Sequence, residues 1–553
     1  MKNFKYIITV VCSLVAMTSC IEDLSQYEYK QTNKVTFDSF LDHDYTWTSG
    51  EEVELTAPLT FSQPYENEAD IDKDFEITWY ANAEVIAQGY RIKYVVDKIG
   101  AFSIVLKVVN RTTGETYVSD IFRSNAKSSF GWGWVVLSER DNEASSMSFI
   151  SPLGLFATHN LENNIPDGLG TGPKNIYHYY VLGSIPDVYI SGLSKVIVNQ
   201  KSGTVTLDGD SFQKDKWMRD EFASGSEPVE DFTMAGFAWK ETYYLIYTPE
   251  GDIYQRCMTH DYAGVPYYST YSSTPVAFDG GAKIGCFNSF KNVSYLVPNE
   301  SVTMLYDELN ARFLAVTRGG YGDTYDEYSP KVIYLNFYDQ EGEFDPSVPK
   351  VNNLGAGTKC LAIGAYEFTG VTESGGYNSF PKYVTLIDLG GSKNYQIYRF
   401  SVTPMSATNH VITENTMVPF TGASLMTDDS KVLMSTDFEK NPFFYFTDGD
   451  KKLYVYSMEA GTHVLAYEAT SKITGLSSSS LACPFSAYGA NSTAANFRLA
   501  LTQEGGTVSV LDVAEAKMVK LFEGQKPDLL LKSISGFGEI KDIEWVTNYE
   551  GEF

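Results

Sequence analysis

The chain has 553 residues, of which 43% are hydrophobic, and its formal net charge at pH 7 is -28. The length exceeds one ordinary domain and the apolar content is ample for a large core, so we expect two domains. The acidic balance argues against nucleic-acid binding, because neutralising phosphates needs clustered lysines and arginines. With 39 tyrosines, 33 phenylalanines and few stretches of helical periodicity, the sequence predicts an all-β fold.

Residues 1–19 have the pattern of a signal peptide. The segment MKNFKYIITVVCSLVAMTSC carries two lysines, an apolar stretch from Tyr6 to Met17 that is too short to span a bilayer, and small residues before Cys20. That ending resembles a bacterial lipobox, with Met17 where leucine is commonest. The resemblance implies cleavage before Cys20 and acylation of its sulfur and its new amino group. An ordinary secretory signal is the alternative.

Residues 20–33 are polar and predict a tether. The acidic pair Glu22-Asp23 lies directly behind Cys20 and Ile21, and it looks like the export signal that sends lipoproteins of the Bacteroidota to the outer leaflet of the outer membrane. Several acyl chains, such as palmitate, hold a protein on a membrane effectively permanently. We therefore expect a lipid-anchored protein on the cell surface.

Residues 34–125 alternate short β-rich segments with turns at roughly 8 to 15 residues, the rhythm of an immunoglobulin-like sandwich. The expected strands are Val35–Phe37, Glu52–Leu55, Phe75–Tyr80, Arg91–Val96, Ala101–Val109 and Thr116–Phe122.

Residues 130–553 repeat a second pattern, in which a strand, a glycine-containing or polar turn and another strand recur at roughly 50 to 70 residues. The copies are Trp134–Ile150, Lys195–Leu207, Tyr243–Tyr254, Phe313–Tyr325, Tyr383–Phe400, Phe443–Met458 and Leu499–Val513, of which the Phe313 copy is the weakest. This spacing predicts a β-propeller with seven blades. A sandwich array, a β-helix, and propellers with six or eight blades are the alternatives.

Closing a ring of blades removes exposed sheet edges, and one chain end can supply the strand that does so. Residues 540–546, from Ile540 to Val546, are the natural closing strand, and we expect them beside the blade that starts at Trp134.

The two parts together resemble a known family. Phe75-Glu-Ile-Thr-Trp79-Tyr80, followed by Ile99-Gly100-Ala-Phe102 and the alternating strand up to Val109, is similar to the PKD (polycystic-kidney-disease) module, although the WDFGDG turn of that module is missing. The segment from Gly131 to Glu139 (GWGWVVLSE) looks like the propeller entry of the PKD-like lipoproteins of Bacteroidota. These lipoproteins are commonly encoded beside a TonB-dependent SusC-like transporter and its SusD-like lipoprotein.

Motifs for catalysis and metal binding are not recognisable in the sequence. The chain lacks HExxH, G-x-S-x-G, P-loop and dinucleotide-binding patterns. Asp70, Asp72 and Asp74 alternate as in a calcium loop, but the required glycine and glutamate are missing, which favours a solvated acidic loop. We therefore expect no enzymatic activity, cofactor or metal, although a pair of carboxylates in the propeller mouth stays possible.

Four cysteines remain in the mature chain, without any CxxC spacing. Buried free thiols are the simplest interpretation, and a disulfide such as Cys257 to Cys286 is the alternative. The full set is Cys257, Cys286, Cys360 and Cys483.

Two long segments mix tyrosine with glycine, proline and serine, unlike core strands. Tyrosine offers a rigid face and a hydroxyl, which suits sugar stacking or protein contact, while packing over neighbouring blades is the alternative. The candidate ligand- or partner-binding residues are Tyr262, Tyr267, Tyr268, Tyr271, Tyr321, Tyr325 and Tyr328.

The resemblance implies a non-catalytic accessory subunit of a SusC/SusD-like uptake complex for peptides or oligosaccharides. The anchor, the scaffold and the aromatic segments agree with that function. A stand-alone surface glycan-binding protein is the alternative, and a propeller hydrolase or lyase acting on glycan or peptide is a third hypothesis.

Overall fold

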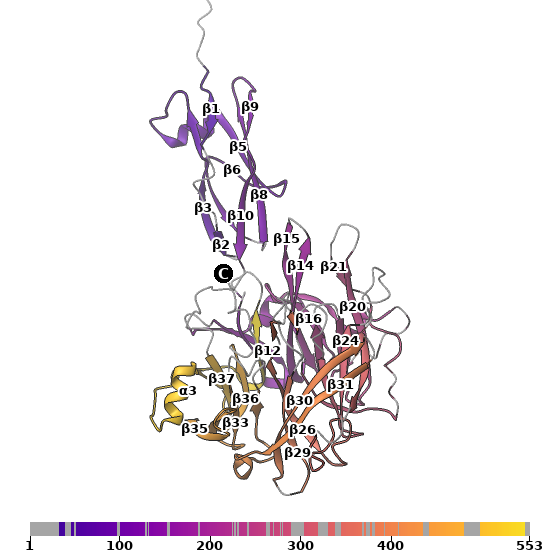
Figure 1. Cartoon of the computed structure of the whole chain (residues 1–553). Coiled ribbons are helices and arrows are strands. Elements are labelled where there is room, and N and C mark those ends of the chain that lie inside the picture. The colour runs from indigo at the N-terminus through magenta and orange to yellow at the C-terminus, as the bar shows by residue number, and fades with distance from the viewer. Residues whose placement is uncertain are drawn as a thin grey trace, which may run out of the picture. The chain divides into compact units, whose positions relative to one another are not determined.

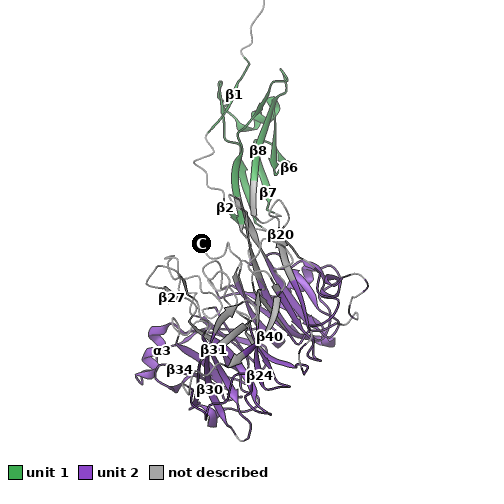
Figure 2. Ribbon diagram, turned by 45° about the vertical axis from the view of Figure 1, so that its right-hand side comes forward, with its two compact units in different colours: residues 1–127 green, residues 128–553 purple. Residues whose placement is uncertain are grey.

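The structure is a computed structural model, shown in Figure 1. It describes residues 32–38, 46–48, 51–96, 100–127, 130, 132–151, 155–185, 188–223, 225, 228, 232–240, 243–260, 266–268, 270–276, 278, 280–288, 303–318, 330–337, 344–367, 370–371, 377–378, 382–391, 393–406, 409–434, 442–479 and 498–547. The chain divides into two compact units, residues 1–127 and residues 128–553 (Figure 2).

Unit 1 consists of one large sheet and two strand pairs. The large sheet has the order β2 (Thr46–Thr48), β10 (Phe122–Lys127), β8 (Gly100–Asn110), β5 (Phe75–Ala81) and β6 (Glu84–Gln88), with β9 (Thr116–Val118) also on β8. The pairs are β1 (Val35–Phe37) with β4 (Leu59–Phe61) and β3 (Glu52–Thr56) with β7 (Arg91–Val95). Alternate residues of all these strands except β6 and β9 enter one hydrophobic cluster, which is the packing of a β-sandwich.

Trp79 on β5 lies in the centre of this cluster with 1% of its surface exposed, and its indole donates a 3.0 Å hydrogen bond to the carbonyl of Gly89. The acidic loop before β5 is held by hydrogen bonds rather than being solvated throughout. Asp72 accepts from the backbone of Tyr90 at 2.8 Å, and Asp74 accepts from the hydroxyl of Tyr65 at 2.8 Å. The carboxylates therefore fix a short helical turn, η2 (Glu68–Asp70) and α2 (Ile71–Asp74), against the sandwich.

Unit 2 contains seven antiparallel four-stranded blades within its described residues. In order from the innermost strand, blade 1 is β40 (Glu539–Thr547), β11 (Trp132–Glu139), β12 (Ser145–Ile150) and β13 (Ala157–Thr158); blade 2 is β14 (Pro173–Ile185), β15 (Val188–Gln200), β16 (Val205–Asp208) and β17 (Lys214–Trp217); blade 3 is β18 (Gly236–Lys240), β19 (Tyr243–Tyr247), β20 (Ile253–His260) and β21 (Pro266–Tyr268). Blade 4 is β22 (Ile284–Asn288), β23 (Thr303–Asp307), β24 (Arg312–Arg318) and β25 (Pro330–Phe337); blade 5 is β26 (Lys359–Glu367), β29 (Lys382–Asp388), β30 (Tyr395–Ser406) and β31 (Asn409–Pro419). Blade 6 is β32 (Val432–Leu433), β33 (Phe443–Thr447), β34 (Lys452–Ser457) and β35 (Thr462–Glu468); blade 7 is β36 (Ile473–Ser478), β37 (Arg498–Gln503), β38 (Thr507–Asp512) and β39 (Leu530–Ser535).

Seven hydrophobic clusters lie between the blades, one at each boundary of the ring. The second strand of a blade feeds two of them at once. On β33, Phe443 and Tyr445 enter the cluster shared with blade 7, whereas Phe444 and Phe446 enter the cluster shared with blade 5. The apolar run of this strand is therefore buried on both faces, as its sequence predicts. These observations confirm the all-β fold and the propeller.

The C-terminal strand closes the ring. β40 pairs antiparallel with β11 and supplies the innermost strand of blade 1, while the other three strands come from the start of unit 2. β40 also lies against the innermost strands β14 and β36 of the two neighbouring blades. Expected closing residues Ile540 and Val546 pair with Ser138 and Gly133.

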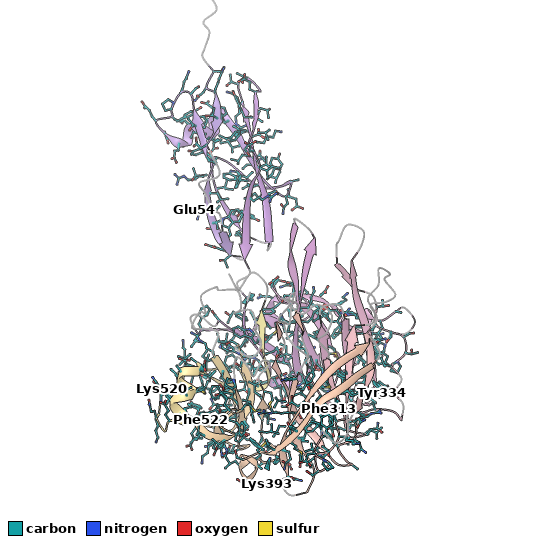
Figure 3. All side chains as sticks on the ribbon, in the orientation of Figure 1. Glu54, Phe313, Tyr334, Lys393, Lys520 and Phe522 are labelled. Carbon is teal, nitrogen blue, oxygen red and sulfur yellow. The ribbon has the colours of Figure 1, made fainter. Side chains whose placement is uncertain are left out.

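Two further features join neighbouring blades. The outer strands β25 and β31 pair in parallel from Leu335↔His410 to Phe337↔Ile412, which links blades 4 and 5 into one eight-stranded sheet. The helix α3 (Glu515–Phe522) follows β38 and ends at Phe522, which Figure 3 labels. The ring of Phe522 stacks on that of Phe443 of blade 6, with 5.9 Å between ring centroids.

One expected hairpin is wrong, because it is displaced by one strand along the chain. The segment Phe313–Tyr325 starts in the third strand of blade 4, so Phe313 pairs with Tyr306 before it. The strand that follows, β25, is described from Pro330 onward. The tight turn that joins β23 to β24 contains no glycine, and Ala311 adopts the left-handed backbone conformation there, with φ of 49°. Because Gly319 and Gly320 come after β24 in the sequence, the pattern of a glycine-containing turn points to the following segment instead.

Candidate binding surface

The connections between strands emerge from the ring at two faces. Because the strands of a blade alternate in direction, the connections from first to second strand and from third to fourth strand lie at one face. We call this face the loop face. Three hairpins extend along it, namely β14–β15 from blade 2, β20–β21 from blade 3 and β30–β31 from blade 5 (Figure 1).

Two of these hairpins are long compared with the blade bodies. β14 and β15 have 13 residues each, and β30 and β31 have 12 and 11, whereas the outer three strands of blade 7 have 6 each. In the third hairpin, β20 has 8 residues and β21 has 3. Pairing in the first hairpin continues to Ile185↔Val188 at its tip. At the loop face, these strands therefore extend beyond the four-stranded blades that form the ring.

The tyrosines predicted to bind a ligand or partner belong to the third-to-fourth connections of blades 3 and 4. Tyr267 and Tyr268 lie on β21, where their backbones pair with Thr259 and Met258 of β20. Four others lie outside the described residues, although the strands that flank them end at the loop face. These four are Tyr262, Tyr321, Tyr325 and Tyr328.

Tyr271 does not belong to this surface, and its prediction as an exposed binding residue is wrong. Only 1% of its surface is exposed, its ring lies 5.2 Å from that of Phe222, and the guanidinium of Arg256 lies 4.5 Å from its centroid. Its backbone donates a 2.9 Å hydrogen bond to the carbonyl of Glu221. The chain returns here from the loop face into the boundary between blades 2 and 3.

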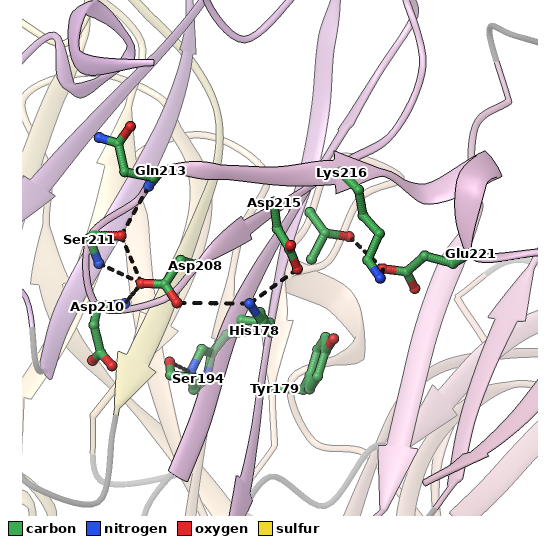
Figure 4. Close-up of polar contacts among 12 residues, drawn as sticks. His178, Tyr179, Ser194, Asp208, Asp210, Ser211, Gln213, Asp215, Lys216 and Glu221 are labelled. Atoms are coloured by element: carbon green, nitrogen blue, oxygen red, sulfur yellow. Dashed lines mark hydrogen bonds and ion pairs between the residues drawn. The ribbon is translucent and has the colours of Figure 1, made fainter. Parts of the chain in front are cut away.

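That boundary contains a buried ion pair. Glu221, in the 3-10 turn η5 (Met218–Glu221), lies 2.5 Å from the guanidinium of Arg256 on β20, and both side chains are only 2% exposed. Thr206 donates to the same carboxylate at 3.4 Å, and Lys216 approaches it at 3.9 Å (Figure 4). Burying two charges is costly unless they are paired, so each partner depends on the other.

Aromatic rings complete the surroundings of this ion pair. The guanidinium of Arg256 faces the ring of Tyr244 at 5.1 Å as well as that of Tyr271, and it donates to the hydroxyl of Tyr179 at 3.4 Å. Burial alone lowers the pKa of Arg256, but the attraction of these neighbours and of Glu221 outweighs it, so the pKa lies above its usual value. The arrangement keeps the cation charged and joins two blades.

Blade 2 holds further paired polar groups (Figure 4). Lys195 on β15 lies 3.1 Å from Asp215 and 3.8 Å from Asp208, with 13% of its side chain exposed. Asp208 also accepts hydrogen bonds from the backbone and hydroxyl of Ser211, which closes the turn between β16 and β17. These charges hold strands together.

A buried Ser–His hydrogen bond is also present in blade 2. Nε2 of His178 lies 3.0 Å from Oγ of Ser194, and each residue is 2% exposed. Gly209 is packed so tightly here that a Cβ at its position would lie 2.1 Å from the same Oγ. Both side chains are buried and each has its partner within the blade, so the contact has a structural explanation.

A small polar pocket of about 80 Å³ lies in blade 5. Lys382, Arg399 and Glu414 line it together with Tyr383, Val384 and Phe400. Ligand pockets for small molecules usually measure about 300–1,000 Å³, so this one suits a few waters or one small group rather than a whole substrate.

Within the described residues, no group of three or more His, Cys, Asp or Glu side chains is arranged to hold a metal ion. None of the helices described is long and apolar enough to cross a membrane. Cys20, the expected lipid-attachment residue, lies outside the described residues. The buried ion pair and the Ser–His contact have no local sequence signature, because the two partners of each contact come from different elements.

No protein-family model matches the sequence, and no curated protein matches it. Among solved structures, the chain is similar to a quinonprotein alcohol dehydrogenase-like protein from Bacteroides thetaiotaomicron VPI-5482, with 11% identity over 93% of this chain and 97% of that one and a TM-score of 0.34. It is also similar to apo AztD from Citrobacter koseri, with 10% identity over 86% of this chain and 99% of that one and a TM-score of 0.33. A third similar structure is that of oligogalacturonate lyase in complex with manganese, with 11% identity over 75% of this chain and 95% of that one and a TM-score of 0.30. Similarity at this level carries no argument about function.

Proposed function

We propose that the protein is a non-catalytic lipoprotein of the outer cell surface that serves as an accessory subunit of a SusC/SusD-like, TonB-dependent uptake complex. In this function it provides a docking or binding surface for the complex, or for the peptide or oligosaccharide that the complex imports. The partners are the SusC-like transporter and the SusD-like lipoprotein, and the attachment to the membrane is through lipid on Cys20.

The observation that carries the proposal is the extension of the loop face. Hairpins from blades 2, 3 and 5 lengthen this face, and the tyrosine-rich connections of blades 3 and 4 join strands that end there. Tyrosine is enriched at protein interfaces because it combines a large apolar ring with a hydroxyl. A rigid ring with such a face suits a protein that binds other molecules.

The polar interior supports the non-catalytic part of the proposal. The ion pair Glu221–Arg256 and the contact between His178 and Ser194 are buried and have their partners within the blades. Catalytic groups instead need access to substrate and an orientation toward the reacting atoms. The described polar clusters therefore have structural explanations.

The test is purification from native membranes. The protein carries an affinity tag at its C-terminus, outer membranes are extracted with mild detergent, and co-purifying proteins are identified by mass spectrometry. We expect a TonB-dependent transporter and a SusD-like lipoprotein in near-stoichiometric amounts. Repeated recovery of this chain alone would contradict the proposal.

A hairpin variant makes the test specific to the loop face. Joining Val181 to Leu193, which are paired across the β14–β15 hairpin, through an Asn-Gly turn removes the tip and keeps the blade. We expect reduced co-purification with unchanged thermal unfolding. Leu309→Ala is the matched control, because Leu309 is 62% exposed in a turn at the opposite face.

Direct binding to immobilised polysaccharide distinguishes the stand-alone alternative. Binding without any co-purifying transporter, abolished by Tyr267→Ala or Tyr268→Ala, would favour an independent glycan-binding protein. Turnover of glycan or peptide that is lost on changing one carboxylate in the propeller mouth would instead establish an enzyme.

A further inference from the structure

Two cysteines from neighbouring blades meet near the inner side of the ring. Cys286 lies on β22, the innermost strand of blade 4, and Cys360 lies on β26, the innermost strand of blade 5. The two strands run side by side, and Cys286 packs against the hydrophobic cluster that contains Cys360. Both are free thiols in this structure.

Their surroundings are those of a packed core. Cys360 is 7% exposed and belongs to the hydrophobic cluster between blades 4 and 5, against which the half-buried Cys286 packs. The hydroxyl of Tyr306 donates a 2.8 Å hydrogen bond across this boundary to the carbonyl of Thr358, two residues before Cys360. The strands that carry the thiols are therefore fixed relative to each other.

We propose that Cys286 and Cys360 form a disulfide that links the innermost strands of blades 4 and 5. The outer strands β25 and β31 of the same two blades are already hydrogen-bonded to each other. The disulfide would thus join the two blades at their inner ends as well, and it would close a loop of roughly 75 residues, long enough to constrain the unfolded chain considerably. It requires export to an oxidising compartment, which the signal peptide implies.

The pairing differs from the sequence-based alternative of Cys257 with Cys286. Cys257 lies on β20, the third strand of blade 3, where it pairs with Tyr243. Cys286 is on the first strand of another blade, which runs beside the strand of Cys360, and it packs against the cluster that contains Cys360. Spatial proximity, rather than spacing in sequence, selects the partner.

The oxidation needs a disulfide oxidant, such as an envelope thiol oxidase or oxidised glutathione. The thiolate of Cys286, the more accessible of the two, attacks the oxidant and forms a mixed disulfide, releasing one thiolate of the oxidant. Cys360 then loses its proton and attacks the sulfur of Cys286, and the second thiolate leaves. In total, two thiols lose two protons and two electrons, and the oxidant disulfide becomes two thiols.

Burial, together with the neighbouring Cys286, raises the pKa of the Cys360 thiol. Cys360 is therefore a poor first nucleophile, and the order of attack given above follows from its burial and its raised pKa. Formation should be faster at alkaline pH, because the second step removes the proton from Cys360.

The test is peptide mapping of the full-length protein purified from the cell envelope. Free thiols are alkylated under denaturing conditions, the protein is digested without reduction, and linked peptides are identified by mass spectrometry. We expect one linked pair that contains Cys286 and Cys360, and a decrease of about 3–8 °C in the midpoint of thermal unfolding after reduction.

Three variants separate the disulfide from general effects on folding. Cys286→Ser and Cys360→Ser should each abolish the linked pair and the effect of reduction on the midpoint, whereas Cys257→Ser should retain both. If either serine variant does not fold, the presence or absence of the linked peptide in the natural protein still shows whether the disulfide forms. Alkylation of both thiols after treatment with oxidised glutathione, or a linked peptide with Cys257, would overturn the proposal. Neither result bears on co-purification with a transporter.

Discussion

Trp134 and Trp545 lie directly opposite each other in the strand pair that closes the ring, with their ring centroids 4.7 Å apart in an edge-to-face arrangement. One tryptophan comes from the start of unit 2 and the other from nearly the end of the chain. Both are buried in the cluster between blades 1 and 7. Closure thus depends on an aromatic contact as well as on backbone hydrogen bonds.

Replacing Trp545 with alanine should lower the free energy of unfolding by about 3–5 kcal/mol, the usual cost of truncating a buried tryptophan. Chemical denaturation followed by fluorescence measures this change. Phe156→Ala is the control, because Phe156 is 58% exposed, and its effect should stay within about 0.5 kcal/mol.

Deleting residues 539–553 removes the whole closing strand. Blade 1 then exposes the inner edge of β11. The innermost strands of blades 2 and 7, β14 and β36, lose their contacts with β40. We expect loss of cooperative unfolding in calorimetry. A deletion variant with an unchanged unfolding transition would contradict the closure mechanism.

The buried ion pair between blades 2 and 3 predicts strong coupling. Glu221→Gln or Arg256→Met alone leaves an unpaired buried charge and should destabilise the protein by about 3–5 kcal/mol. The double variant should be less destabilised than the sum of the two, and a double-mutant cycle in urea measures the difference. Additive effects would show that the two charges are stabilised independently.

The structure also explains which elements can be predicted from sequence. The second and third strands of a blade contribute to two hydrophobic clusters, so they appear as apolar runs joined by a short turn, as in Phe443–Met458, where Gly449 adopts φ of 81°. Six of the seven expected hairpins match such pairs. The outer strands are harder to recognise. β39, for example, has mostly exposed residues, including Leu530 and Leu531.

The surface was harder to predict than the ring, because burial depends on partners from other blades. Tyr271 follows Tyr267 and Tyr268 in a similar sequence context, yet Phe222 and Arg256 enclose it. Likewise, the proximity of Cys286 and Cys360 follows only from the meeting of two blades. Neither the burial of Tyr271 nor the proximity of the two cysteines can be predicted from the composition of the neighbouring sequence.

The burial of Tyr271 gives a further prediction. Tyr271→Ala should destabilise the protein by about 3–5 kcal/mol, because it opens a cavity beside Arg256. Tyr271→Phe keeps the ring and should cost much less. If Tyr271→Ala leaves thermal unfolding unchanged while reducing ligand binding, the residue is a surface group after all.

The proposed lipid anchor is tested at Cys20. Cys20→Ala should prevent acylation, so the protein should move from the detergent phase to the aqueous phase in Triton X-114 partitioning and should no longer incorporate labelled palmitate. Glu22→Ala with Asp23→Ala should keep the lipid but reduce exposure to externally added protease. Detergent-phase partitioning of the Cys20 variant would argue for a different attachment.

Two histidines predict how stability depends on pH. Burial lowers the pKa of His463, and burial with the nearby Arg140 lowers that of His159. In the unfolded chain both histidines have a pKa of about 6.5, so as the pH falls the unfolded state takes up protons before the folded state does. The free energy of unfolding should therefore be unaffected by these groups above that pH and should decrease as the pH falls through it toward the lower folded values. Thermal unfolding at pH 7.5 and 5.5 measures the effect, which should be smaller in a variant with His159→Gln and His463→Gln. An equal decrease in the natural protein and in this variant would show that other groups cause the pH dependence.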